Sequence, residues 1–394
     1  MKNLYQFLPS PAPDYAGVSS LLFEMDVLTV FLDPHGCHGQ TLYYSEPRFQ
    51  SFNTVPKSFS FSVTEIDAIK GIDLLLIQKI KNALLHISAK AIALVGGPVS
   101  TIISTDLSAL EKKLEKETGL PVFSVSTTGL DTYEVGQKKL LFQLINKFTN
   151  THIISPHSSE VHILGATPLD GWDDTSICEY IDLLKSAGAD SVVCWGHGGD
   201  LNSIASVHKA NLLVATSASG LFAADMLSKK YKIPYIVGFP VGTIEYFAFF
   251  EALKNFFLGM PIEKNPSSLK CTANALGKTA LIIADQINAN AMRSCLINEF
   301  GYRKADIISL FSLDPNFACE GDSQILSEHS ITEFYTTHGP YDSVIGDPIY
   351  QSMLPENVHF IPCPHPGLSG ILYWDDCFSY FGKKGTQFFS GFLL

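Results

Sequence analysis

The stretch Val27-Leu28-Thr29-Val30-Phe31-Leu32 runs directly into Asp33-Pro34-His35-Gly36-Cys37-His38-Gly39. The first half is a continuous apolar run with β-branched members, and this pattern predicts a buried strand. The glycines of the second half allow a tight turn after that strand. The turn would then lie at the carboxyl end of the first strand, where open α/β sheets bind their ligands.

A thiol between two imidazoles follows the predicted strand, and this combination is typical of soft-metal ligands. Cys37, His35 and His38 are therefore candidate metal ligands. One cysteine cannot hold an iron–sulfur cluster alone, because such clusters usually take four protein ligands. The other ligands would have to come from elsewhere in the fold or from a second subunit. The alternative is that Cys37 is an inert small residue, as most lone cysteines are.

The composition describes a globular protein with large buried cores, since 46% of the 394 residues are hydrophobic and 17% are charged. The length predicts two or three domains. The formal net charge of −12 argues against a nucleic-acid partner, because phosphate binding requires concentrated lysine and arginine. The eight cysteines show no CxxC spacing, which indicates free thiols or a few metal-bound thiolates in a reducing cytosol.

The N-terminal segment lacks the apolar core of a signal peptide, because Ser10-Pro11-Ala12-Pro13 interrupts it. No apolar stretch reaches the roughly 18–20 residues of a membrane helix. Even the most apolar helical segment, 246–260, carries Glu251 and Lys254. We therefore expect a soluble, cytoplasmic protein with no membrane partner.

Strand-like and helix-like segments alternate along the chain, which predicts an α/β fold with parallel sheets. We expect three doubly wound (Rossmann-like) domains at 1–155, 156–265 and 266–394, with the polar stretch 263–268 as a linker. The expected strands are 27–32, 91–95, 122–125, 161–164, 191–195, 211–215, 234–238, 279–284, 305–310 and 358–361. The expected helices are 107–117, 133–148, 177–187 and one after Trp374.

In open α/β sheets the loops at the carboxyl ends of the strands form the ligand crevice. The loops that follow predicted strands here carry Cys37, Gly97, Thr127, His197, Ser217 and His365. The candidate ligand-binding or cofactor-binding residues of the crevice are His197, Ser217, Ser219 and His365.

Some of these loops also have a purely structural interpretation. The glycines of 196–199 serve a turn equally well, with Cys194 as a small buried residue. The prolines of Cys363-Pro364-His365-Pro366-Gly367 stiffen a loop whether or not it holds a ligand. Gly277-Lys278-Thr279 imitates part of a phosphate-binding loop, but Thr272 stands where that motif needs glycine and a strand is expected to follow. We therefore expect no ATP site in this chain.

Short motifs follow one another in a fixed order along nearly the whole chain. They are His35-Gly36-Cys37, 64–71, 110–122, Thr127-Thr128-Gly129, Tyr133-Glu134-Val135-Gly136, 195–200, 210–214 and 231–235. Together they resemble the component 1 superfamily of nitrogenase-like oxidoreductases. This superfamily includes the subunits of the nitrogenase molybdenum–iron protein and of dark-operative protochlorophyllide reductase.

The resemblance implies three α/β domains around a central cleft. It also implies a dimer, either a homodimer or a pair with a paralogous component 1 subunit, with an iron–sulfur cluster, [4Fe–4S] by analogy, at the interface. Electrons would come from a separate ATP-hydrolysing iron protein and would reduce an unidentified substrate in the cleft. Asp33, His35 and His38 could then join Cys37 as cluster ligands.

The departures from the family pattern keep other functions open. The family typically supplies three cluster cysteines per subunit, and only Cys37 is present here, because no cysteine precedes it and Gly97 stands at the third position. Ala215 stands near the position of the cysteine that anchors the nitrogenase metallocofactor, so dinitrogen reduction with that cofactor is not expected. The alternatives are a scaffold or carrier for a metallocofactor or tetrapyrrole, and a cluster-free small-molecule binding protein.

Overall fold

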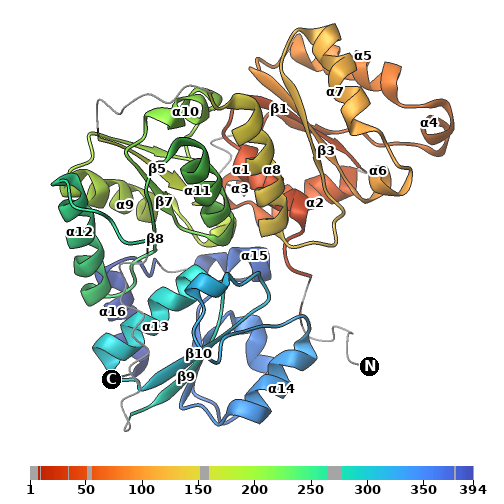
Figure 1. Cartoon of the computed structure of the whole chain (residues 1–394). Coiled ribbons are helices and arrows are strands. Elements are labelled where there is room, and N and C mark those ends of the chain that lie inside the picture. The colour runs from red at the N-terminus through yellow and green to blue at the C-terminus, as the bar shows by residue number, and fades with distance from the viewer. Residues whose placement is uncertain are drawn as a thin grey trace.

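The structure is a computed structural model that describes residues 8, 10–33, 35–50, 56–150, 159–264, 277–376 and 379–393. For residues 35–37, 40, 50, 65, 68 and 376 it describes the backbone only. Within these ranges the strands form three sheets, and every strand pair is parallel, which confirms the predicted α/β class. Figure 1 shows the three sheets as separate layers, each flanked by its own helices.

The first sheet has the order β2-β1-β3-β4. Its strands are β1 (Val27–Leu32), β2 (Ser58–Ser60), β3 (Ala91–Gly96) and β4 (Val122–Ser126). Every residue of β1 and β3 is buried, because helices cover both faces of the sheet. One face packs on α5 (Asp73–Leu84) and α7 (Leu107–Thr118), and the other on α1 (Asp14–Leu22) and α8 (Tyr133–Phe148). The apolar run 27–32 is therefore a central strand, as its sequence predicts.

The second sheet has the order β6-β5-β7-β8, and the third the order β11-β10-β9-β12-β13. The strands of the second sheet are β5 (Glu160–Leu164), β6 (Ser191–Cys194), β7 (Leu212–Ala215) and β8 (Tyr235–Val237). Those of the third are β9 (Thr279–Ile283), β10 (Lys304–Ser309), β11 (Ser323–Gln324), β12 (Ser343–Gly346) and β13 (Phe360–Pro362). In each sheet the chain adds strands first on one side of its first strand and then on the other, so the strand order reverses next to β5 and next to β9. Such a reversal opens a crevice at the carboxyl ends of the strands.

The helices of the second and third sheets also bind the parts of the molecule together. They are α9 (Asp174–Ala187), α10 (Leu201–Ser206), α11 (Ala218–Tyr231), α12 (Thr243–Phe257), α13 (Gln286–Phe300), α14 (Glu328–His338), α15 (Pro366–Ser369) and α16 (Lys383–Leu393). Helix α8 of the first unit packs on α11 of the second, and the C-terminal helix α16 packs on both α12 and α13 (Figure 1). Short 3-10 helices lie at Pro168–Asp170 (η1), Val207–Lys209 (η2), Pro315–Phe317 (η3), Pro348–Met353 (η4) and Gly370–Asp376 (η5).

The stretch after β1 differs from the expected turn. Residues His35–Ser45 form helix α2, so Cys37 lies in the first turn of a helix and not in a loop. Tertiary packing outweighs the poor helix propensity of the glycines here, because the His38 ring stacks on Phe31 and Leu42 is buried. Two further short helices, α3 (Pro47–Gln50) and α4 (Glu65–Lys70), follow before the next long helix, and α6 (Pro98–Ile102) follows β3.

Strand β9 begins at Thr279, so Gly277 and Lys278 lead directly into a strand, as the sequence predicts. Of the expected linker 263–268, residues 265–268 lie outside the described residues. Helix α9 begins three residues earlier than expected, because the Asp173 side chain accepts a hydrogen bond from the Ser176 backbone N–H and caps it. Among the described residues, no helix is long and apolar enough to cross a bilayer.

Candidate functional site

A cavity of about 400 Å³ lies between the second and third sheets. Its walls come from segments that follow β5, β8, β9 and β13, within 168–175, 239, 283–292 and 363–366. Pro47 and Arg48 of α3 complete one side. The cavity therefore lies at the carboxyl ends of strands from two sheets, which is where this kind of architecture binds ligands.

Aromatic side chains form much of the cavity wall. Trp172 and Phe239 line it, and their rings meet edge to face with centroids 4.9 Å apart. Trp374 and Tyr380 line it from the C-terminal part of the chain. Such a surface suits a flat organic molecule, because aromatic faces offer large contact areas at little cost in conformational entropy.

Asp170 is the most perturbed acid on the wall. It ends η1, and its side chain is buried. Thr167 Oγ1 donates a hydrogen bond to Asp170 Oδ2 at 2.6 Å, and the Tyr133 hydroxyl donates to Oδ1 at 3.1 Å. Burial raises the pKa of Asp170 to about 7, and the Asp285 carboxylate adds to this rise, whereas the hydrogen bonds oppose it. Asp170 therefore exchanges a proton near neutral pH.

Ser217 and Ser219 lie behind this acid, not on the cavity wall. Gln137 Nε2 donates to Asp170 Oδ2 at 3.3 Å, and Ser219 Oγ donates to Gln137 Oε1 at 2.7 Å. The two serine hydroxyls are 3.0 Å apart, and Ser217 caps α11 by accepting the Gly220 backbone N–H. The structure thus connects the two predicted serines to Asp170 through Gln137.

His365 lines the cavity, and its orientation is fixed from behind. The backbone N–H of His365 and the Ser369 hydroxyl each donate to Asp347 Oδ2 at 2.7 Å. The Gly367 backbone N–H donates to His365 Nδ1 at 3.1 Å, so the proton of the neutral ring is on Nε2. Burial lowers the pKa of His365, while Asp285 and Asp347 act in the opposite direction.

The Nε2 atom of His365 faces a second acid. It lies 3.7 Å from Asp285 Oδ2, and within the described ranges it has no hydrogen-bond partner. Asp285 caps α13 by accepting the Asn288 backbone N–H at Oδ1, and the Asn288 side-chain amide donates to Oδ2 at 2.8 Å. His365 is therefore a neutral donor that points at a carboxylate without reaching it.

His197 lies beside the cavity and not among its lining residues. Its Nε2 atom is 3.2 Å from Oδ1 of Asp174, an exposed acid at the rim. Arg48 spans the neighbouring parts of the chain, since it donates to Glu46, to the Gly196 carbonyl at 2.8 Å and to the Ser20 carbonyl at 2.6 Å. Arg48 thus holds the loop of His197 against α1.

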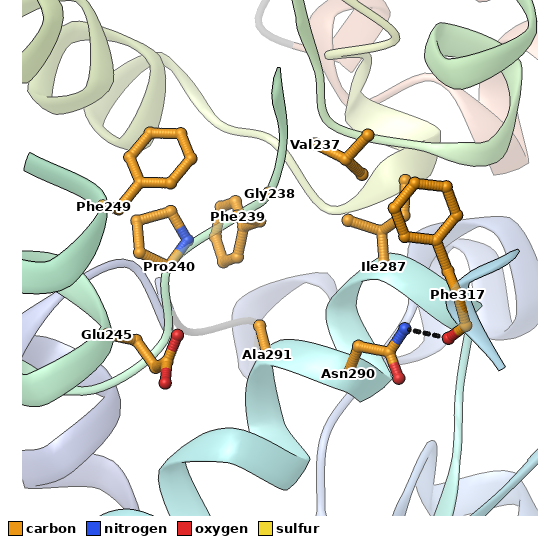
Figure 2. Close-up of a pocket in the computed structure, with 10 residues that line it drawn as sticks. All are labelled: Val237, Gly238, Phe239, Pro240, Glu245, Phe249, Ile287, Asn290, Ala291 and Phe317. Atoms are coloured by element: carbon orange, nitrogen blue, oxygen red, sulfur yellow. Dashed lines mark hydrogen bonds between the residues drawn. The ribbon is translucent and has the colours of Figure 1, made fainter. Parts of the chain in front are cut away.

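A smaller hollow lies next to the cavity, on the other side of Phe239. Figure 2 shows Phe239, Pro240 and Phe249 on one side and residues of α13 on the other. Asn290 Nδ2 donates to the Phe317 carbonyl at 2.8 Å across one edge. Its volume of about 20 Å³ holds a water molecule at most, so this hollow is too small for a substrate.

Sequence reasoning selected His365 and missed the acids. Asp285 directly follows a predicted strand and Asp170 lies in the loop after another, so the rule that selected His365 could have found them. Arg48 and Trp374 carry no such signal, because tertiary packing alone brings them to the site.

A family model described as "Nitrogenase component 1 type Oxidoreductase" matches residues 14–289, which is more than half of the chain. The chain belongs to this family. Two solved structures share the fold of this component 1 protein over its whole length. They are "Nitrogenase Cp1 at pH 6.5" (14% identity, TM-score 0.73, 94% of that chain covered) and "Nitrogenase Cp1 at pH 5" (15% identity, TM-score 0.68, 90% covered). A search of curated proteins finds no match.

Component 1 proteins typically bind iron–sulfur clusters. The residues at the predicted cluster position offer little room and few ligands for one. Gly97 stands where the sequence resemblance places a cluster cysteine, and the position has no room for a side chain, because a Cβ there would lie 2.6 Å from the Asp33 carboxylate. Asp33 is itself buried, and the Val99 backbone N–H donates to it at 3.4 Å. Asp33 therefore occupies the space that a side chain at position 97 would need.

Within the described ranges, the remaining candidate ligands do not complete a cluster site. The side chains of Cys37 and His35 lie outside what the structure describes, and His38 packs its ring against Phe31 at a centroid distance of 4.0 Å. Burial raises the pKa of Cys363, the thiol on the cavity wall, to about 12, so it is not a thiolate. Among the described residues, no group of three or more potential ligands is arranged to hold a metal ion. A cluster on this component 1 chain would need ligands beyond these residues, from the rest of the chain or from a second subunit.

Proposed function

We propose that this chain is a reductase of the component 1 type that reduces an organic substrate in the cavity between its second and third sheets. The observation that carries the proposal is Asp170, a buried carboxyl on the cavity wall whose pKa is about 7. Adding electrons across a multiple bond requires a proton for each new bond to hydrogen. A carboxyl that is half protonated near neutral pH is a suitable donor for that proton.

The surrounding residues prepare Asp170 for this role. The Tyr133 hydroxyl and the Thr167 hydroxyl hold the carboxyl in one orientation, and Gln137 ties it to the buried serines. His365 offers its Nε2 proton to a substrate oxygen or nitrogen on the opposite side. After Asp170 gives up its proton, the same hydrogen bonds stabilise the negative charge on its carboxylate.

In this proposal the electrons come from an ATP-hydrolysing iron protein, and the dimer interface near Cys37 receives them through an iron–sulfur cluster. The partner is a second copy of this chain or a paralogous component 1 subunit. The described residues do not complete a set of cluster ligands, so the proposal assigns no step to the cluster itself.

A carrier or cluster-free binding protein is the second candidate. The packing of Asp33 into the space beside Gly97 favours it, since that position cannot supply a ligand. Under this alternative the same cavity binds its ligand without reducing it.

Iron content and visible absorbance of protein purified without oxygen distinguish the two. We expect iron and a broad visible absorbance in the wild type, and their loss in Cys37→Ser. Cys178→Ser is the matched control, because Cys178 is exposed on α9, and it should keep its iron. A colourless wild type that takes up no iron after anaerobic reconstitution, or a Cys37→Ser variant with unchanged iron, would contradict the reductase proposal.

A further inference from the structure

Acidic side chains outnumber basic ones on the wall of the cavity, and Asp285 carries its negative charge there even while Asp170 holds a proton. Asp170 and Asp285 are buried in it, and Asp173 and Asp174 stand at its rim. Arg48 is the one lysine or arginine among the lining residues, and two carboxylates already neutralise it: Glu46 at 2.7 Å and Glu24 at 3.7 Å. His365 adds no positive charge, since its ring is neutral. A bound anion would therefore meet uncompensated carboxylates in a partly buried space.

The aromatic wall favours the opposite sign. Trp172, Trp374 and Tyr380 line the same cavity as the carboxylates. A cation over the face of a tryptophan or tyrosine ring is attracted by the ring quadrupole, and the attraction grows when water is excluded. Carboxylates and aromatic faces together are the two features by which proteins recognise organic cations.

Two buried donors on the wall indicate what else the ligand carries. His365 is 8% exposed, and its Nε2 proton has no hydrogen-bond partner in the described part of the chain. The buried Nε1 proton of Trp374 likewise has no hydrogen-bond partner among the described residues. A buried donor without an acceptor costs free energy, so a ligand that offers an acceptor at this position gains affinity.

We propose that the substrate of this site is a flat organic cation, a positively charged nitrogen heterocycle that also bears a hydrogen-bond acceptor such as a carbonyl oxygen. The inference rests on the proposed function and names its substrate class. The cationic ring stacks on the tryptophans with its charge toward Asp285, and the acceptor oxygen takes the proton of His365. A polycarboxylate ligand is excluded from the cavity by the same carboxylates.

Three molecules of one shape test the charge preference directly: 1-methylnicotinamide is a cation, nicotinamide is neutral and nicotinate is an anion. We expect calorimetric titration of the full chain to show that the cation binds at least roughly tenfold more tightly than nicotinamide, in line with a cation–π contact and one nearby carboxylate. Nicotinate should bind more weakly than nicotinamide. Equal or tighter binding of nicotinate, or no binding of the cation, overturns the inference.

Asp285→Asn should remove most of the preference for the cation while keeping the affinity for neutral nicotinamide. Asp182→Asn, an exposed acid farther along α9, should leave all three affinities unchanged. If Asp285→Asn does not fold, the ranking of the three ligands on the wild type still decides. Iron without a cation preference overturns only the substrate class, whereas a cation preference without iron overturns the reductase and keeps the binding site.

Discussion

The chemistry of the site depends on how single carboxyl groups are surrounded. Asp170 accepts three side-chain hydrogen bonds, which lower its pKa. Its burial next to Asp285 raises the pKa by more than the hydrogen bonds lower it. Asp347 is buried as well, and burial raises its pKa, although the backbone N–H groups of Ile349 and His365 donate to it. The balance of desolvation against hydrogen bonds thus sets which groups hold a proton at neutral pH.

The raised pKa of Asp170 makes the stability of the fold dependent on pH. Between about pH 4 and pH 7 the unfolded chain has released this proton and the folded chain still holds it, so the free energy of unfolding falls as the pH rises through that window. The rise from the ordinary 3.8 to about 7 corresponds to a loss of up to roughly 4 kcal/mol. In Asp170→Asn, which cannot ionise, urea titrations at both ends of the window should show this loss removed.

Asp182→Asn serves as the control for that experiment and should keep the decline seen in the wild type. An identical decline in Asp170→Asn and the wild type would mean that Asp170 does not titrate in this range.

The contact between Gly97 and Asp33 predicts a coupled pair of substitutions. Gly97→Ala should destabilise the protein by about 1–3 kcal/mol, because the new Cβ overlaps the Asp33 carboxylate. The backbone of Gly97 is extended, so alanine itself is tolerated there. Asp33→Gly in the same chain should restore most of the loss, and a double-mutant cycle by urea unfolding measures this coupling.

Gly39→Ala is the matched control, since nothing lies within 4 Å of a Cβ at that position of α2. It should be neutral or slightly stabilising, as is usual for alanine in place of a helical glycine. Additive effects of Gly97→Ala and Asp33→Gly would contradict the steric explanation.

Among the elements, the crossing of α1 and α8 does most to position the site. The two helices touch backbone to backbone: a Cβ on Gly136 would overlap the Asp14 carbonyl, and a Cβ on Gly17 would overlap the Tyr133 carbonyl. Helix α8 then carries Tyr133 and Gln137 to Asp170. The close crossing therefore sets how far two hydrogen-bond donors reach toward the acid on the cavity wall.

Gly136→Ala should destabilise the protein by about 3 kcal/mol or more, because the clash is with backbone that cannot rotate away. Gly391→Ala in α16, where nothing lies within 4 Å, should leave the unfolding midpoint in urea unchanged or raise it. A wild-type midpoint for Gly136→Ala would show that α1 and α8 do not cross this closely.

The sequence predicted the long central elements well and the short ones poorly. The apolar run 27–32 and the helix 133–148 have the bounds that their patterns indicate, because packing on both faces leaves a clear signal. The edge strands β2 and β11 are too short to show any periodicity. At α2 the glycines predicted a turn, but the segment is a helix, and packing such as the stacking of His38 on Phe31 stabilises it.

For the molecule as a whole, we infer that two component 1 subunits together form the cluster site. The three sheets and the cavity between the second and third are formed within one chain. The described residues contain no complete set of cluster ligands, and Asp33 occupies the space that a side chain at position 97 would need. The domain limits 1–155, 156–265 and 266–394 stay a prediction, and the packing of α16 on α12 indicates that the C-terminal helix joins the second unit to the third.

Native mass spectrometry of protein purified without oxygen tests this claim most directly, since one spectrum reports both the number of chains and the bound cluster. For the chain expressed alone or with its paralogous partner, we predict a dimer that carries the mass of one iron–sulfur cluster per pair of chains. The cluster mass should disappear on air exposure and in Cys37→Ser. A monomer, or a dimer without added mass after anaerobic reconstitution, would contradict a cluster site shared by two subunits.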